Sequence, residues 1–316
     1  MISKTAISSV VFTNCTGRKL QKNDVARLAL MPLPASVDEL SARWCDQLQQ
    51  VPNTYPVEAL YAGRAFQDAR RAARFLEAPM YIASAGLGMT SASEAVPAYD
   101  MTVADSGATI LPILRKIGSD TTDWWRSLNT ARGHPRPIAS EMHRLKRATW
   151  YLAMPGTYLT MLTEELLQLP AEAIDRIRIF TSSGWARSAP QVLSNQVLPY
   201  DDRLEGTRLA GTRGDFAQRA LLHFLEDLGG HVLPMDEARE MVTMAMALSV
   251  RRELPSRSKK SDEEIIQILR NNWHQHDGVG GRLLRFLRDK ALIQCEQSRF
   301  KSLWHAVRDE INRETL

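Results

Sequence analysis

Four short apolar runs, each followed by small polar residues, most constrain how this chain can fold. The runs span residues 9–13, 80–85, 150–154 and 176–181. Their β-branched and aromatic residues are typical of buried strands. Segments with helical spacing lie between them, as at residues 37–50, where Leu40, Trp44 and Leu48 fall on one face. Alternating strands and helices predict an α/β domain whose central, mainly parallel sheet is flanked by helices.

The length of the chain, 316 residues, is enough for two domains with a sizeable core. Its content of 44% hydrophobic and 24% charged residues is ordinary for a globular protein. A helix at residues 217–228 is expected to close the first domain. We therefore expect an α/β domain at residues 1–250, a polar linker at 251–262 and a small helical module at 263–316.

The C-terminal segment holds the chain's net positive charge. Residues 251–316 contain 14 Lys/Arg and 10 Asp/Glu, a difference of +4 that equals the charge of the whole chain. A basic module indicates a polyanionic partner such as nucleic acid. The pattern predicts a compact three-helix or winged-helix unit, in which Arg282, Arg285 and Arg288 recur on one helix and are expected to contact DNA phosphates. The alternative is that these arginines form the solvated side of an amphipathic helix.

The polar loop after the first run, residues 14–19, has the composition of an anion-binding loop. Gly17 permits a tight turn, and Arg18 and Lys19 can face a phosphate. The loop is not a nucleotide-triphosphate P-loop, because Phe12 stands where that motif has its first glycine. Kinase and ATPase chemistry is therefore not expected. The alternative interpretation is a strand end with solvated charges.

The sequence gives no sign of a membrane span, a secretory leader or a cofactor site. No stretch approaches the roughly 18 apolar residues of a membrane-spanning helix. The cysteines, Cys15, Cys45 and Cys295, are odd in number and far apart, which favours a reducing cytoplasm. His274 and His276 lack a clear third ligand, and no Gly-x-Gly-x-x-Gly opens a helix after a strand. We therefore expect neither a metal nor a dinucleotide cofactor.

Four motif segments together resemble a known family, although none does so alone. They are Thr-Asn-Cys-Thr-Gly-Arg-Lys at residues 13–19, Tyr-Ala-Gly-Arg-Ala-Phe at 61–66, Tyr-Ile-Ala-Ser-Ala-Gly-Leu-Gly at 81–88 and Pro-Ala-Tyr-Asp at 97–100. Their order resembles a family of uncharacterised bacterial domains related to peroxide-stress DNA-binding proteins and to the uracil-DNA-glycosylase-like superfamily. The resemblance covers residues 8–105 and is weaker up to residue 230. It implies a uracil-DNA-glycosylase-like α/β fold.

One member type, a bacteriophage-defence DNA glycosylase, resembles this chain in pairing an α/β pocket domain with DNA-binding elements. The activity that this implies is excision of glucosylated hydroxymethylcytosine from phage DNA, which leaves an abasic site. The expected partner is double-stranded, modified phage DNA. The chain lacks the Gly-Gln-Asp-Pro-Tyr segment and the His-Pro-Ser loop of the familiar uracil glycosylases, so the roles of its residues must be argued from chemistry.

Cleavage of an N-glycosidic bond needs a carboxylate that stabilises an oxocarbenium-like sugar or activates water. We expect Asp100 to supply it, with Asp201, Asp202 and Asp215 as alternatives; an Asx turn or a helix cap would equally explain Asp100. Asn14 is the second candidate catalytic residue, since its amide can read a base edge. The expected substrate contacts are Cys15, Arg18, Lys19, Tyr61, Arg64, Tyr99 and Trp185, in which the aromatic rings stack on the flipped base and the cations hold phosphates.

Two other functions stay open at this point. A non-catalytic DNA-binding stress protein would bind DNA in a salt-dependent manner and form no product. A small-molecule nucleoside or nucleotide glycosyl hydrolase or transferase would act on free nucleotides without residues 255–316. Cys15 is also a rival nucleophile, but no histidine lies near it in the sequence to activate the thiol.

Overall fold

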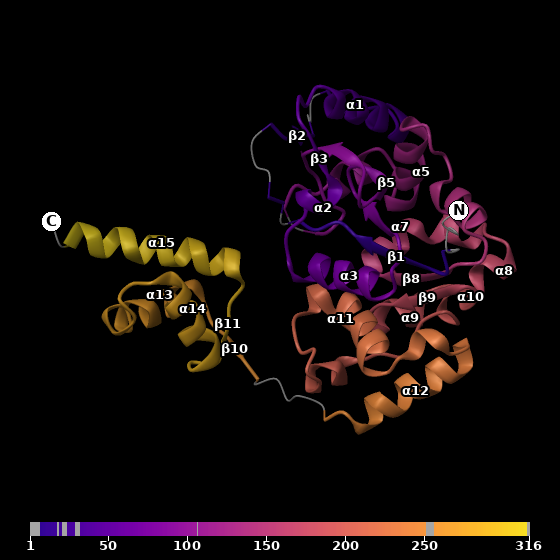
Figure 1. Cartoon of the computed structure of the whole chain (residues 1–316). Helices are drawn as coiled ribbons and strands as arrows, with labels where there is room; N and C mark the ends of the chain where they lie inside the picture. The colour runs from indigo at the N-terminus through magenta and orange to yellow at the C-terminus, as the bar shows by residue number, and fades with distance from the viewer. Residues whose placement is uncertain are drawn as a thin grey trace. The chain divides into compact units, whose positions relative to one another are not determined.

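The computed structural model describes residues 7–17, 19–20, 24–28, 32–105, 107–250 and 256–314. The chain divides into two compact units, Met1–Arg252 and Glu253–Leu316, and the division falls inside the segment expected to be a linker (Figure 1). Among the described residues no helix has the length and apolar character needed to cross a bilayer.

The first unit is built on a five-stranded sheet in the order β5-β4-β1-β8-β9. The central strand β1 (Ser9–Asn14) runs parallel to β4 (Met80–Ser84) on one side and to β8 (Thr149–Ala153) on the other. Strand β9 (Ile177–Phe180) continues the parallel part beyond β8. Strand β5 (Gly88–Ser91) is antiparallel to β4 at the opposite edge. The predicted mainly parallel α/β sheet is confirmed.

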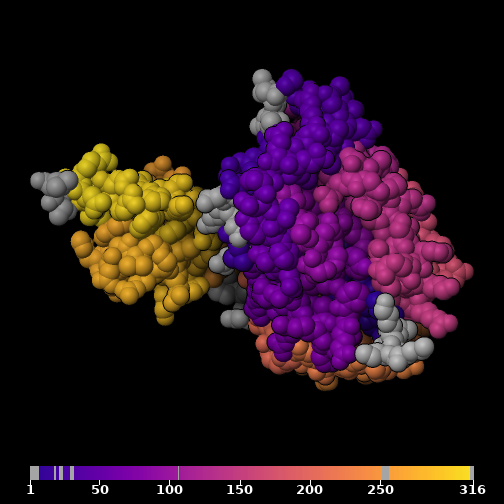
Figure 2. Space-filling model, turned by 45° about the horizontal axis from the view of Figure 1, so that its top comes forward, coloured from indigo at the N-terminus to yellow at the C-terminus, as the bar shows by residue number. Residues whose placement is uncertain are grey.

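Helices cover both faces of this sheet (Figure 1). On one face α3 (Arg64–Phe75) packs against α11 (Phe216–Leu222), and these two helices contact β1 and β8. On the other face α1 (Val37–Gln49), α5 (Thr121–Ala131) and α7 (Gly156–Leu167) pack in a row. Because both faces are covered, the apolar residues of β1 need not alternate with polar ones. The space-filling view shows indigo, magenta and orange segments of this unit packed into one body (Figure 2).

The remaining helices and strands complete the first unit. They are β2 (Ala26–Arg27), β3 (Thr54–Pro56), α2 (Val57–Leu60), β6 (Ala95–Pro97), β7 (Tyr99–Asp100), α4 (Leu111–Lys116), α6 (Pro137–Arg144), α8 (Ala171–Ile174), α9 (Ser183–Ser188), α10 (Gln191–Ser194) and α12 (Met235–Leu248).

The end of the first unit differs from the expected single helix at residues 217–228. Helix α11 passes into a π-helical turn at His223–Asp227, and the chain then turns at Gly229, whose φ is +60°. A further helix, α12, closes the unit. The sequence did not predict it, because Met244 and Leu248 are exposed and blur the amphipathic pattern.

The second unit is a small helical module, as predicted. It holds α13 (Asp262–Asn271), α14 (Gly280–Asp289) and α15 (Gln297–Glu314) around a core that includes Leu283 and Leu287. The two-residue strands β10 (Ser258–Lys259) and β11 (Ile293–Gln294) pair in parallel. A winged helix has an antiparallel wing, so within residues 256–314 the structure is a three-helix unit instead.

Candidate functional site

The strand order places a topological switch point at the carboxyl ends of β1 and β8. The connection after β1 leads toward β4, whereas the one after β8 leads away toward β9. Ligands of open α/β sheets bind where neighbouring connections diverge in this way. Asn14 ends β1 and Ala153 ends β8, so the predicted polar loop begins at this point.

A buried glutamine from α11 joins the two strand ends. Gln218 is 1% exposed, and its Nε2 lies 2.9 Å from Asn14 Oδ1, 3.0 Å from Thr13 Oγ1 and 2.9 Å from the Ala153 carbonyl oxygen. Asn14 Nδ2 donates to the carbonyl of Cys15 at 2.7 Å. Both ends of the Asn14 amide are therefore engaged within the protein. The expected readout of a base edge by Asn14 does not fit this conformation.

The thiol of Cys15 lies beside a tyrosine rather than a histidine. Its Sγ is 3.0 Å from the hydroxyl of Tyr158, which belongs to the first turn of α7. Burial raises the pKa of Tyr158, so its hydroxyl is protonated at neutral pH and can donate to sulfur. Cys15 is only 3% exposed. Among the described residues, no histidine forms a hydrogen bond to it that would activate the thiol as a nucleophile.

Three hydroxyl groups form a chain under the loop. Tyr99 Oη lies 2.7 Å from Tyr61 Oη and 2.7 Å from Ser84 Oγ, and Ser84 Oγ accepts from the backbone N–H of Leu87. A Cβ at Gly86 would lie 2.4 Å from the Tyr99 ring, which is why glycine is needed there.

The burial of these two tyrosines corrects an expectation. Tyr61 and Tyr99 are 1% and 0% exposed, and their rings pack edge-on against Phe66 and Trp44. Neither ring offers a face on which a flipped base could stack. Their role in this structure is to support the loop by packing and by hydrogen bonds.

Lys19 lies over the buried ring of Tyr99 and near the exposed carboxylate of Asp100. Its Nζ lies 4.0 Å from the centre of the Tyr99 ring. Burial lowers the pKa of Lys19, and the nearby Cys15 and Asp100 act in the opposite direction. Asp100 itself is exposed on β7, next to buried Tyr99. The structure thus brings Cys15, Lys19, Tyr99 and Asp100 into one neighbourhood.

Two of the alternative carboxylates have structural partners. Asp215 Oδ1 lies 2.6 Å from Nε of Arg219, whose side chain is 0% exposed. Asp201 accepts from the guanidinium of Arg203 and from the backbone N–H of the same residue. Arg64 is half exposed, and its Nε lies 3.6 Å from Asp68 Oδ2 and 3.9 Å from Asp215 Oδ2, so an anion would share it with two carboxylates.

Three further residues named from the sequence remain to be placed. Trp185 on α9 is partly exposed and lies over the start of α7, where a Cβ at Gly156 would come within 2.8 Å of the Trp185 Cβ. Arg18 lies outside the described residues. Asp202 is exposed at the start of a short 3-10 turn.

The arginines of α14 do not form one uniform face. Arg288 donates to the carbonyl of Cys295 at 2.7 Å, and Arg282 pairs with Asp277. Arg285 is exposed, and within residues 256–314 it has no ion-pair partner. Of these three arginines, Arg285 is therefore the one that can contact a phosphate without first breaking an ion pair or a hydrogen bond described within residues 256–314.

The carboxyl edge of the sheet is thus the candidate site, and Gln218, Tyr158 and Ser84 join the residues predicted for it. Ser84 belongs to the motif segment at residues 81–88, although no role was expected for it. Sequence patterns could not identify Gln218 and Tyr158, because each is a single polar residue within an ordinary helix. In the described part of the chain no group of three His, Cys, Asp or Glu side chains could hold a metal ion. Comparisons with protein-family models, with curated proteins and with solved structures found no match for this chain.

Proposed function

We propose that this protein is a DNA glycosylase that hydrolyses the N-glycosidic bond of a flipped, modified base in antiviral defence. The observation that supports it is the convergence of the four motif segments at the carboxyl edge of the sheet. The loop after β1 brings Cys15 and Lys19, and the other segments bring Tyr61, Ser84 and Tyr99 with Asp100. The modified base proposed as substrate is glucosylated hydroxymethylcytosine in phage DNA.

Asp100 is the group best placed to act on the sugar. Its carboxylate is exposed, so it can approach the anomeric carbon of an extruded nucleotide. As the bond between C1′ and the base nitrogen breaks, the bonding electrons leave with the base and positive charge develops on the sugar. A carboxylate there stabilises this charge or takes a proton from the attacking water. The water oxygen bonds to C1′, and the proton that the water loses balances the one that the departing base nitrogen takes up, so the products are the free neutral base and an abasic site.

The other residues bind and position the substrate. Lys19 and Arg64 hold the phosphates that flank the flipped nucleotide. Trp185, the partly exposed candidate among the three aromatic residues, stacks on the base in place of Tyr61 and Tyr99. Gln218 holds Asn14 in one orientation, so Asn14 shapes the floor of the pocket. The basic second unit contacts the DNA backbone.

A non-catalytic DNA-binding protein is the second candidate. The observation that favours it is the burial of Asn14, Tyr61 and Tyr99, whose polar atoms bond to other groups of the protein. Such a protein would bind DNA through its exposed cations and would not need Asp100.

An assay of abasic sites separates the two candidates. The full-length protein is incubated with phage DNA that contains glucosylated hydroxymethylcytosine and, separately, with the same DNA containing unmodified cytosine. The glycosylase proposal predicts abasic sites in the modified DNA only. If both DNAs are bound in a salt-dependent manner and neither gains abasic sites, the protein is a DNA-binding protein without this activity.

A further inference from the structure

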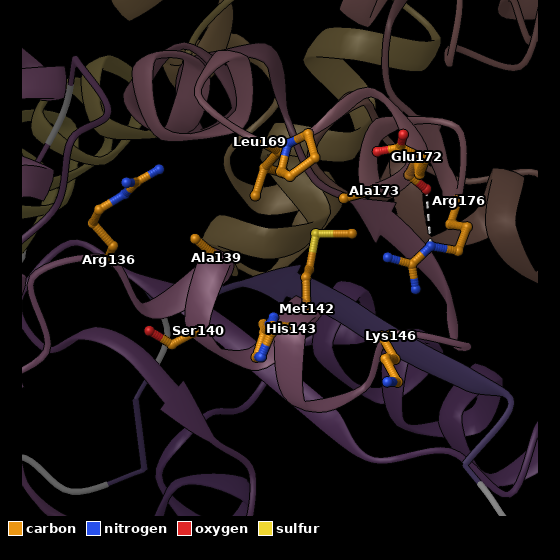
Figure 3. A pocket seen from close by; sticks show the side chains of 11 residues that line it. Arg136, Ala139, Ser140, Met142, His143, Lys146, Leu169, Glu172, Ala173 and Arg176 are labelled. Atoms are coloured by element: carbon orange, nitrogen blue, oxygen red, sulfur yellow. Dashed lines mark hydrogen bonds between the residues drawn. The ribbon is translucent and has the colours of Figure 1, made fainter.

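A cavity of about 730 Å³ opens on the first unit, and Figure 3 shows the side chains that line it. Its lining comes from α6, from the turn after α6 and from the segment around α8. The residues are Arg136, Ala139, Ser140, Met142, His143, Lys146, Leu169, Pro170, Glu172, Ala173 and Arg176.

The cavity lies at the amino ends of the strands. Lys146 comes shortly before β8, and Arg176 directly precedes β9. The candidate site lies at the carboxyl ends, after Asn14 and Ala153. Because parallel strands have their two ends on opposite edges of the sheet, the cavity and the candidate site are separate.

The floor of the cavity is apolar. Met142, Leu169 and Ala173 line it and are 2%, 6% and 6% exposed, so they are packed in fixed positions. Figure 3 shows Arg136 and Arg176 at opposite ends, with Met142 and Ala173 between them. A flat apolar group on this floor would lose its contact with water, which favours binding.

The cations around the floor are held in place by the backbone. Nε of Arg176 donates to the carbonyl of Glu172 at 3.0 Å, and its Nη1 lies 3.4 Å from the carbonyl of Leu145. Arg136 Nη2 lies 3.4 Å from the carbonyl of Gln168. Carbonyl partners orient a guanidinium and leave its charge uncompensated.

The charge of the lining is positive. Arg136, Lys146 and Arg176 are basic residues, and Glu172 is the single carboxylate among the lining residues. Across the described ranges of the chain none of these three basic residues lies within ion-pair distance of a carboxylate, whereas Arg126 on α5 pairs with two. Arg136 is near enough to Glu165 to act on its pKa, so Lys146 and Arg176 are the more available pair. An anion would therefore find unpaired donors at the rim of the cavity.

We propose that this cavity binds a small soluble organic anion, an aromatic or fused-ring compound with a carboxylate, sulfonate or phosphate group. The ring lies on Met142 and Ala173, and the anionic group lies between Arg176 and Lys146. A nucleic acid backbone fits less well, because a phosphodiester chain has no apolar group for this floor. The proposal does not depend on the glycosylase activity.

The probe is 8-anilinonaphthalene-1-sulfonate, followed by its fluorescence with the folded, full-length protein. We expect one saturable site and, for R176Q and K146Q, at least about a tenfold weaker affinity, as loss of a charge-assisted contact implies. R147Q is the matched control, because Arg147 is exposed, adjacent to Lys146 in sequence and absent from the lining. N-phenyl-1-naphthylamine, the uncharged analogue, is expected to bind at least about tenfold more weakly.

Three results would overturn the proposal. In the first, the wild-type protein does not bind the sulfonate, or R176Q and K146Q bind it as tightly as R147Q does. In the second, the uncharged analogue binds as well as the sulfonate, which shows a merely apolar surface. In the third, a short DNA duplex displaces the dye and binds R176Q more weakly than the wild-type protein, which shows a nucleic-acid surface. Thermal unfolding of each variant shows that it is folded.

Discussion

Nε2 of Gln218 lies 2.9 Å from Oδ1 of Asn14, although 204 residues separate them in the sequence. The contact joins α11 to the end of β1 at the point where the connections of the sheet diverge. It also fixes which way the Asn14 amide faces, because Asn14 Nδ2 must then donate to the Cys15 carbonyl. The candidate site thus depends on a residue from the last third of the first unit.

Replacement of Gln218 by leucine removes this contact. It also removes the hydrogen bonds that Gln218 Nε2 donates to Thr13 Oγ1 and to the Ala153 carbonyl oxygen. Because buried acceptors are left without partners, we expect Q218L to lower the free energy of unfolding by about 1–3 kcal/mol. Urea denaturation measures it. Q191L is the control, since Gln191 is exposed on α10 and its side chain donates to the exposed Asn195; its change should stay below about 0.5 kcal/mol. Equal effects of the two variants would contradict the role given to Gln218.

The four parallel strands of the central sheet could be predicted from the sequence, whereas the antiparallel edge strand β5 and the core of the site were not. Runs such as residues 9–13 are continuous and apolar because both faces of the sheet are covered. Such a run can be recognised from neighbouring residues in the sequence alone. The contacts of Gln218 and of Tyr158 with Cys15 join distant segments and leave no periodic signal. Tyr61 and Tyr99 illustrate the same limit, because an aromatic residue at the end of an element gives no indication of which way its ring faces.

Replacement of Arg219 by methionine tests the buried ion cluster. Arg219 is 0% exposed and bonds to Asp215, to Glu205 and to the carbonyls of Leu209 and Thr212. We expect R219M to cost about 3–5 kcal/mol of stability, because the buried carboxylate of Asp215 loses its close ion-pair partner and keeps only the more distant Arg64, at 3.9 Å. Thermal or urea unfolding measures the loss.

The matched control for R219M is R126M, which removes two ion pairs at the surface. Its cost should be below about 1 kcal/mol. The double variant with Asp215→Asn is expected to recover part of the stability lost in R219M. A cost for R219M no larger than that for R126M would show that the buried cluster contributes little.

The stability of the first unit should fall as the pH drops below 6.5. Burial lowers the pKa of His223 from its ordinary value of 6.5, with Arg208 acting in the same direction and Asp227 against it. Between the lowered pKa and 6.5 the unfolded chain binds a proton that the folded chain does not, so stability increases with pH there. Urea unfolding of the wild-type protein and of H223Q, from pH 7.5 down to 5, measures this pH dependence. If the free energy of unfolding of H223Q falls with pH as steeply as that of the wild type, His223 is not the cause.

Arg285 and Arg288 should respond differently to substitution by glutamine. Arg285 is exposed and free to meet a phosphate, so R285Q is expected to weaken DNA binding and to reduce its salt slope by about 1 without loss of stability. R288Q is expected to destabilise the second unit, because Arg288 holds the Cys295 carbonyl. Salt-dependent DNA binding and thermal unfolding of both variants check this. Unchanged DNA binding by R285Q would exclude this side chain from the interface.

The release of base from modified phage DNA, measured for the wild-type protein, D100N and D105N, tests the central claim most directly. Asp105 is an exposed carboxylate of the same segment, so D105N is the matched control. We predict that the wild-type protein and D105N release glucosylated hydroxymethylcytosine at the same rate, and that D100N is slower by about 10²–10⁴-fold while it still binds the DNA. Release by D100N at the wild-type rate, or no release by the wild-type protein, would contradict the claim.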